Sequence, residues 1–215
     1  MTYRIGVEDI EPGQWVAWWF ERPGITGGGR SLPEAVTALS RQVPVIPVEP
    51  IDVFRAYPSL EDPDYLVNAF FEDDRRPLSA AEIADGLARL HESRERLLGL
   101  IHSVGPEVLS RPIEGERFET ILGILRHVAV AEWWYCDRLD GVPDWAALPQ
   151  PPLEALAVSR QNTERFLPTL VDSNQIVTLT GEIWSPRKVL RRTIWHEADH
   201  VGHIQQRLDA IMGGA

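Results

Sequence analysis

The pattern of apolar and polar residues changes character after about the first sixty residues of the chain. Before that point, residues that favour β-strands cluster over 3–7 and again over 14–21, and the turn residues Pro12 and Gly13 lie between the two clusters. This arrangement predicts a β-hairpin. The Gly-rich segment 23–29 follows, and we expect it to carry a third, short strand.

A helix is predicted next, because its start signals are present. Ser31 is an N-cap residue, Pro33 lies in the first turn, and Glu34 stands three residues after the cap. This combination predicts a helix that runs to about Arg41. Residues 43–48 can then return as a fourth strand, so the predicted order of elements is βββαβ.

Prolines then interrupt the chain between Pro44 and Pro63. Each proline fixes φ and removes a backbone donor, which disfavours a continuous helix in this stretch. We therefore place a domain boundary here, with a first domain at 1–60, a linker at 61–77 and a second domain at 78–215.

After the linker, apolar residues recur at three-, four- and seven-residue spacing, which is the period of an amphipathic helix. Capping signals and Gly or Pro residues divide this part into four long helices. Their expected spans are about 79–104, 117–139, 152–170 and 186–212. Together they predict a four-helix bundle, and the whole chain is expected to be an α+β protein of two domains.

Composition narrows the classes of function. The chain has 215 residues and a net charge of −11, which disfavours nucleic-acid binding because such proteins need a basic surface. No apolar run approaches the length of a membrane span, so no membrane role is expected. A single cysteine, Cys136, and a polar start without a signal segment predict a cytoplasmic protein.

Three of the six histidines lie close together in the last predicted helix. His196 and His200 are four residues apart, so their rings stand one turn apart on one face, where both can reach a single metal ion. His203 shares that face, almost two turns from His196. Two ligands are too few for tight binding, and His127, at an inward position of the second predicted helix, is the candidate for a third.

Residues 78–212 resemble the DinB-like metal-binding four-helix bundles. The likeness rests on His127, which acidic and aromatic residues follow, and on the spacing of His196 and His200, which a Gly follows. The resemblance implies that these three histidines bind one divalent transition metal, with Zn expected first and Ni or Fe as alternatives. It also implies a homodimer, and an enzyme class that includes thiol-dependent S-transferases and isomerases.

Several residues surround the predicted ligands. Many DinB-like proteins have Gln at the position of His203, which leaves it as a fourth ligand, a partner of a ligand or a general base; we assign it to the surroundings of the site. Glu197 and Asp199 point away from the direction of His196, so neither is a natural ligand. Either could instead orient an imidazole by a hydrogen bond. Arg192 lies one turn before His196 and could pair with a carboxylate or thiolate of a substrate; a solvated basic face is the alternative.

The same string also satisfies the His-Glu-x-x-His pattern of zinc proteases, at His196, Glu197 and His200. We consider the protease reading weak, because no matching ligand follows downstream and the third candidate lies upstream in another helix.

The βββαβ order of the first fifty residues resembles the small HicB-like antitoxin fold. The likeness rests on the hairpin, the Gly-rich turn and the helix start at Ser31. HicB antitoxins bind an RNA-cleaving toxin, and many carry a DNA-binding module, but nothing in this chain matches such a module. A β-rich appendage that packs on its neighbour or mediates dimerisation is the alternative interpretation, and the one we favour.

Two functions follow from these observations. The first is a metal-dependent enzyme that activates a low-molecular-weight thiol or water for attack on a small-molecule electrophile. The second is a non-enzymatic, metal-stabilised stress-response or interaction protein whose HicB-like domain binds a partner. A metal with an open coordination position would favour the enzyme, and a closed site with a fourth protein ligand would favour the second function.

Overall fold

The computed structural model describes residues 4–11, 13–43, 52–115 and 118–213. The chain forms two compact units. The strand-rich unit comprises Met1–Gly86 and Leu170–Arg191, and the helical unit comprises Leu87–Thr169 and Arg192–Ala215. A compact unit is not by itself a domain, so the limits 1–60, 61–77 and 78–215 stay a prediction.

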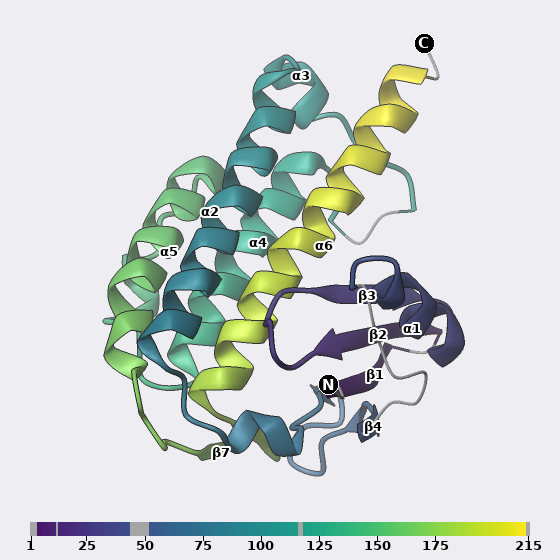
Figure 1. Ribbon diagram of the computed structural model, residues 1–215. Helices are drawn as coiled ribbons and strands as arrows, with labels where there is room; N and C mark the ends of the chain where they lie inside the picture. The colour runs from purple at the N-terminus through teal and green to yellow at the C-terminus, as the bar shows by residue number, and fades with distance from the viewer. Residues whose placement is uncertain (1–3, 12, 44–51, 116–117, 214–215) are drawn as a thin grey trace. The chain divides into compact units, whose positions relative to one another are not determined.

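The main sheet of the strand-rich unit has four strands in the order β3-β2-β1-β4 (Figure 1). β1 (Ile5–Glu11) pairs antiparallel with β2 (Gln14–Trp19), which confirms the predicted hairpin. β2 pairs antiparallel with β3 (Thr26–Gly29), so the Gly-rich segment does carry a strand. β4 (Asp52–Arg55) lies on the other side of β1 and is parallel to it.

The strand that completes this sheet comes later than expected. The prediction placed it at 43–48, but Val43 is a buried residue outside the strands, and 44–48 lie outside the described residues. A parallel pair needs a crossover connection, so the place of the returning strand depends on the path that closes the crossover. A local pattern of apolar residues does not encode that path.

Helix α1 (Leu32–Ser40) forms as its start signals predict, with the Glu34 backbone N–H donating to the Ser31 hydroxyl. The helix packs directly on β3. A Cβ atom on Gly27 would stand only 2.1 Å from the backbone nitrogen of Leu39, so this close approach requires glycine. The Gly-rich sequence is therefore explained by helix packing as well as by a turn.

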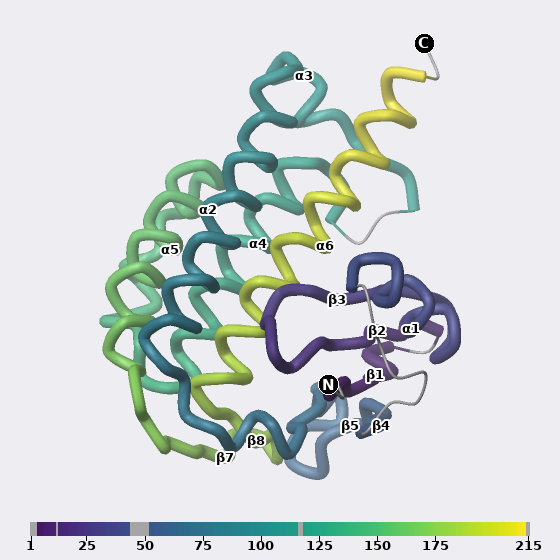
Figure 2. The backbone as a smooth tube through the Cα atoms, in the orientation of Figure 1, coloured from purple at the N-terminus to yellow at the C-terminus, as the bar shows by residue number. Residues whose placement is uncertain are grey.

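The four long helices predicted from the apolar period are confirmed (Figures 1 and 2). They are α2 (Ala80–His102), α4 (Ile121–Asp137), α5 (Pro152–Phe166) and α6 (Pro186–Gly213). The first turns of α2 and α6 belong to the strand-rich unit, and the rest of both helices belongs to the helical unit.

The core of the helical unit draws apolar side chains from all four long helices. Leu97 of α2, Ile124 of α4, Leu156 of α5 and Ile204 of α6 are all at most 1% exposed. The bundle therefore buries the apolar face that the helical period predicts for each of these helices.

Two details of the helices differ from the prediction. α4 begins at Ile121, with Thr120 as its N-cap, rather than near Arg117. Pro106 does not merely end the preceding helix but opens a short one, α3 (Pro106–Leu109). The remaining short elements are β5 (Tyr57–Pro58), β6 (Leu66–Val67), β7 (Val177–Leu179), β8 (Glu182–Trp184) and three 3-10 turns, at Glu72–Arg75, Trp145–Ala147 and Leu167–Leu170.

Candidate metal centre

Three histidines from two helices of the helical unit gather at one point. His127 comes from the middle of α4, and His196 and His200 come from consecutive turns of α6. Each offers a ring nitrogen, and these nitrogens all lie within 4.8 Å of one another. The Nε2 atoms of His196 and His127 are 3.0 Å apart. The structure thus brings together the three histidines that the sequence suggested as ligands.

The surroundings of His196 and His200 keep these two imidazoles neutral. His127 and His196 are partly exposed, and His200 is 9% exposed. Burial, followed by the neighbouring His200, His127 and Arg192, lowers the pKa of His196 well below its usual range. Burial and the neighbouring His127 and His203 lower the pKa of His200 to about 3. At neutral pH the rings of His196 and His200 therefore present unprotonated nitrogens, which is the form that binds a metal.

The donor set fits a divalent transition metal. Three neutral imidazoles are ligands that Zn, Ni and Fe accept, and three protein ligands leave a coordination position for another molecule. Nδ1 of His200 is buried and has no hydrogen-bond partner among the described residues. A buried ring nitrogen without a partner is unfavourable unless something else occupies it, and a metal ion is such an occupant.

His203 lies beside this group but does not join it. Its ring centroid is 5.8 Å from that of His200, and the Arg207 Nε–H donates to the His203 Nε2 over 3.2 Å. Among the described residues, the ligand group contains only His127, His196 and His200. This placement gives no support to the alternative of a fourth ligand.

Glu197 is turned into the interior of the bundle, where it joins an ionic network. Nη2 of Arg94 donates to both Glu132 and Glu197 over 2.7 Å. Arg160 donates to the same two carboxylates over 2.8 Å. All four side chains are at most 9% exposed, and they come one each from α2, α4, α5 and α6.

The ion pairs in this network outweigh the cost of burial. Burial alone would raise the pKa of Glu132, but Arg160 and Arg94 hold that pKa below its ordinary value. Burial would lower the pKa of Arg160, but Glu132 and Glu197 raise it. Glu197 contacts two arginines in this network, and the zinc-protease interpretation, which needs it as a base beside the metal, has no support.

The other predicted neighbours of the ligands are also placed. Asp199 is exposed on α6. Arg192 is 6% exposed, and its guanidinium lies 4.8 Å from the ring centroid of Trp195. A side chain so buried is not part of a solvated basic face.

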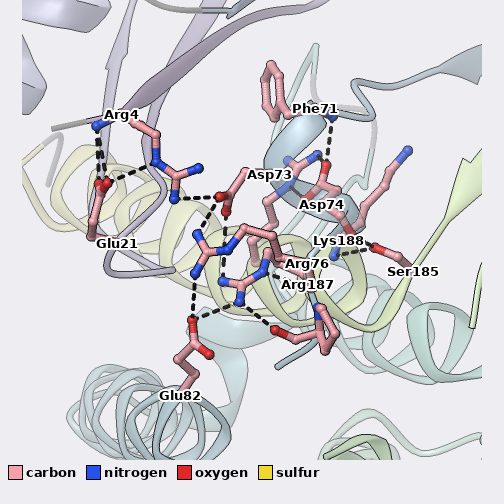
Figure 3. Close-up of polar contacts among 12 residues, drawn as sticks. Arg4, Glu21, Phe71, Asp73, Asp74, Arg76, Glu82, Ser185, Arg187 and Lys188 are labelled. Carbon is pink, nitrogen blue, oxygen red and sulfur yellow. Dashed lines mark hydrogen bonds and ion pairs between the residues drawn. The ribbon is translucent and has the colours of Figure 1, made fainter. Parts of the chain in front are cut away.

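The basic residues before Arg192 are buried in the strand-rich unit. Figure 3 shows the polar contacts of Arg187. Nη2 of Arg187 donates to Glu82 over 2.8 Å, and Arg191 donates twice to Asp74 over 2.8 Å. Nζ of Lys188 donates to two backbone carbonyl oxygens over 3.0 Å. These contacts explain why the start of α6 is basic: its charges are matched by acids and carbonyl groups of the strand-rich unit.

Aromatic rings line the histidine group, and sequence reasoning missed them. The ring of Phe118 stacks on His127 with 4.4 Å between the centroids, and the ring of Tyr135 meets His196 edge-on at 5.8 Å. Phe118 precedes α4, so no helical period marks it. Tyr135 lies two turns after His127, and that spacing on α4 is the signal that could have identified it.

The fold and the three histidines define a four-helix bundle with a candidate metal centre. The model of the DinB superfamily matches residues 89–204, which is more than half of the chain. The chain therefore belongs to the DinB superfamily.

Two solved structures are similar to the chain. One is described as "TT2238, a four-helix bundle protein", with 27% sequence identity and a TM-score of 0.48 over 58% of this chain and 98% of the other. The second is YfiT from Bacillus subtilis, described as "a probable metal-dependent hydrolase with an unusual four-helix bundle topology". It has 20% identity and a TM-score of 0.50, over 65% of this chain and 92% of its own, and this likeness supports the fold.

No curated protein matches the chain. Among the described residues, no helix is both long and apolar enough to cross a membrane.

Proposed function

We propose that His127, His196 and His200 bind one divalent transition metal, Zn in the first instance, in an enzyme that activates water or a low-molecular-weight thiol. The attack is on a small-molecule electrophile. The observation that carries this proposal is the gathering of three imidazole nitrogens within 4.8 Å, from two helices. Histidines in three separate solvated positions would not produce such a group.

Bound to these nitrogens, the metal would act as a Lewis acid that lowers the pKa of a water or thiol and polarises a carbonyl group. The helices α4 and α6 hold the three rings together, and the surroundings of His196 and His200 keep those two imidazoles unprotonated. His127 and His196 are partly exposed, so solvent reaches the ligand group. That exposure favours an enzyme over a closed structural site.

Water and thiol remain two versions of this proposal. The description of YfiT as a probable metal-dependent hydrolase favours water. The DinB-like resemblance favours a thiol, in an S-transferase or isomerase reaction. Both versions use the same three ligands. They differ in whether activity needs an added thiol, so one assay with and without thiol separates them.

The experiment is to load the protein with Zn²⁺ or Ni²⁺ and to assay a panel of esters, amides and thiol acceptors, with and without cytoplasmic thiols. The proposal expects turnover that needs the metal and falls to background in His127→Gln. The matched control is His102→Gln, because His102 is an exposed residue of α2. Activity that His127→Gln leaves unchanged would overturn the mechanism.

Two further proposals concern the rest of the molecule. The order β1, β2, β3, α1, β4 supports the HicB-like resemblance of the N-terminal residues, and that resemblance would make this region a partner-binding element. A homodimer is proposed from the DinB-like resemblance alone, and light scattering of the purified protein measures it.

A further inference from the structure

Phe118 stands next to the candidate metal centre and contacts two of its three ligands. Its ring is stacked on His127, with 4.4 Å between the centroids and 26° between the planes. The same ring meets His200 edge-on at 6.1 Å. A single aromatic side chain thus lies against a ligand from α4 and a ligand from α6.

The three ligands are not held equally well. His196 and His200 share α6, so the helix itself fixes the distance between them. His127 is the only member of the group on α4, and the ring torsion of a histidine is broad and weakly determined by its own backbone. A ring stacked on its face restricts that torsion.

The backbone around Phe118 is held in an unusual conformation. Glu119 has φ of 56°, in the left-handed region that non-glycine residues seldom adopt, and its carbonyl oxygen accepts a hydrogen bond from the Ile113 N–H over 2.6 Å. A Cβ atom on Gly123 would stand 2.1 Å from the carbonyl oxygen of Phe118. Strained positions of this kind persist where the surroundings determine them, and they concentrate at ligand sites.

We infer that Phe118 is a positioning residue of the metal centre, which fixes the ring of His127 in the plane that the metal needs. The inference rests on the proposed function, because it assumes that the three histidines bind a metal. The left-handed Glu119 and the close approach at Gly123 set the place of Phe118, and Phe118 in turn sets the orientation of His127.

The first test replaces the ring and then restores it. Phe118→Leu keeps an apolar side chain but removes the stacking, and it is expected to weaken Zn²⁺ affinity by about 10-fold, the lower end of the effect of residues that orient metal ligands. Phe118→Tyr keeps the ring and is expected to restore the affinity. Competition with a chelator measures the affinity, and the visible spectrum of the Co²⁺-loaded protein reports the ligand geometry.

The second test moves Phe118 without changing it. Gly123→Ala places a Cβ against the carbonyl oxygen of Phe118, whereas Gly99→Ala, the matched control on α2, meets nothing within 4 Å. Alanine is the better helix former at both positions, so a loss at Gly123 cannot come from helix propensity. Gly123→Ala is expected to weaken Zn²⁺ binding and to alter the Co²⁺ spectrum, and Gly99→Ala to do neither.

The outcomes separate this inference from the proposed function. If the wild-type protein binds no metal, the proposed function fails. If the wild type binds Zn²⁺ while Phe118→Leu and Gly123→Ala bind it equally well with an unchanged Co²⁺ spectrum, only the role of Phe118 is overturned. Urea unfolding of each metal-free variant shows whether that variant folds. If Phe118→Leu does not fold, the comparison of Gly123→Ala with Gly99→Ala tests the role of Phe118.

Discussion

Two polar groups lie inside the helical unit, and they differ in charge balance. The ionic network has two acids and two bases, and each carboxylate accepts hydrogen bonds from both arginines. The histidine group has three bases and, among the described residues, no acid in its ligand set. Both groups take residues from α4 and α6. The charges of the network therefore balance within the chain, whereas the histidine group offers ring nitrogens to which we propose that a metal ion binds.

This difference in charge balance predicts that the ionic network stabilises the fold and that the histidine group serves metal binding. A buried ion pair that loses one partner leaves an uncompensated charge, so the network is expected to govern folding. His196 and His200 are neutral and carry no charge to leave behind, so the histidine group is expected to govern binding. The predictions below test this division, from the largest effect to the smallest.

The largest effect is expected when one charge is removed from the network. Glu132→Gln leaves Arg94 and Arg160 with a single carboxylate between them, and we expect the free energy of unfolding to fall by about 3–5 kcal/mol. Urea unfolding of the metal-free protein measures this. The matched control is Glu164→Gln, whose side chain is 39% exposed beside His91; it should change stability by no more than about 0.5 kcal/mol. Equal losses in both variants would contradict a special role for the network.

The second effect is the stabilisation that a metal brings. Zinc at about 100 times its dissociation constant is expected to raise the free energy of unfolding of the wild type by about 2.7 kcal/mol, because it binds only the folded state. His200→Ala should show no such increase at the same zinc concentration. Thermal or urea unfolding with and without zinc compares the two proteins. A zinc effect that survives in His200→Ala would place the metal elsewhere.

A smaller effect is expected when a histidine is replaced in the absence of metal. His127→Leu removes one partly exposed imidazole and puts an apolar side chain in its place. Without metal its stability should stay within about 1 kcal/mol of the wild type, in contrast to Glu132→Gln. Urea unfolding in the presence of a chelator measures the difference. A loss as large as that of Glu132→Gln would mean that the histidines stabilise the fold.

At neutral pH the smallest effect is expected for Cys136, which lies on α4 against Thr163. Burial, more than any other cause, raises the pKa of its thiol from 9.0 to about 12. The native thiol should therefore resist alkylation at pH 8, and labelling should become fast only in urea. Because the folded pKa is the higher one, the thiol contributes full stability below pH 9, and that contribution is lost as the pH rises from 9 to about 12. Mass spectrometry of labelled protein checks the first statement, and rapid labelling of the native protein would contradict it.

Much of the helical architecture can be predicted from local signals. α6 begins at Pro186, after Ser185, as the cap and first-turn residues indicate, and α2 follows the capping box of Ser79 and Glu82. The histidine group can be predicted from the sequence for the same reason. A four-residue spacing on one helix and an inward position on another are both properties of the apolar period.

The ionic network could not be predicted in this way. Arg94, Glu132, Arg160 and Glu197 come from four helices, and the sequence does not say which charges meet across them. The place of Phe118 was equally inaccessible. It depends on the left-handed backbone at Glu119 and on the absence of a side chain at Gly123, which are local conditions that no helical or strand period marks. Local patterns therefore do not predict which side chains of different helices contact one another.

The most direct test of the central claim is the metal content of the protein. Metal-free wild type, His196→Ala/His200→Ala and the control His102→Ala would each be reconstituted with Zn²⁺, freed of excess metal and analysed for zinc per chain. The account predicts one zinc per chain in the wild type and in the control, and none in the double variant. Equal and negligible zinc in the wild type and the double variant would contradict it.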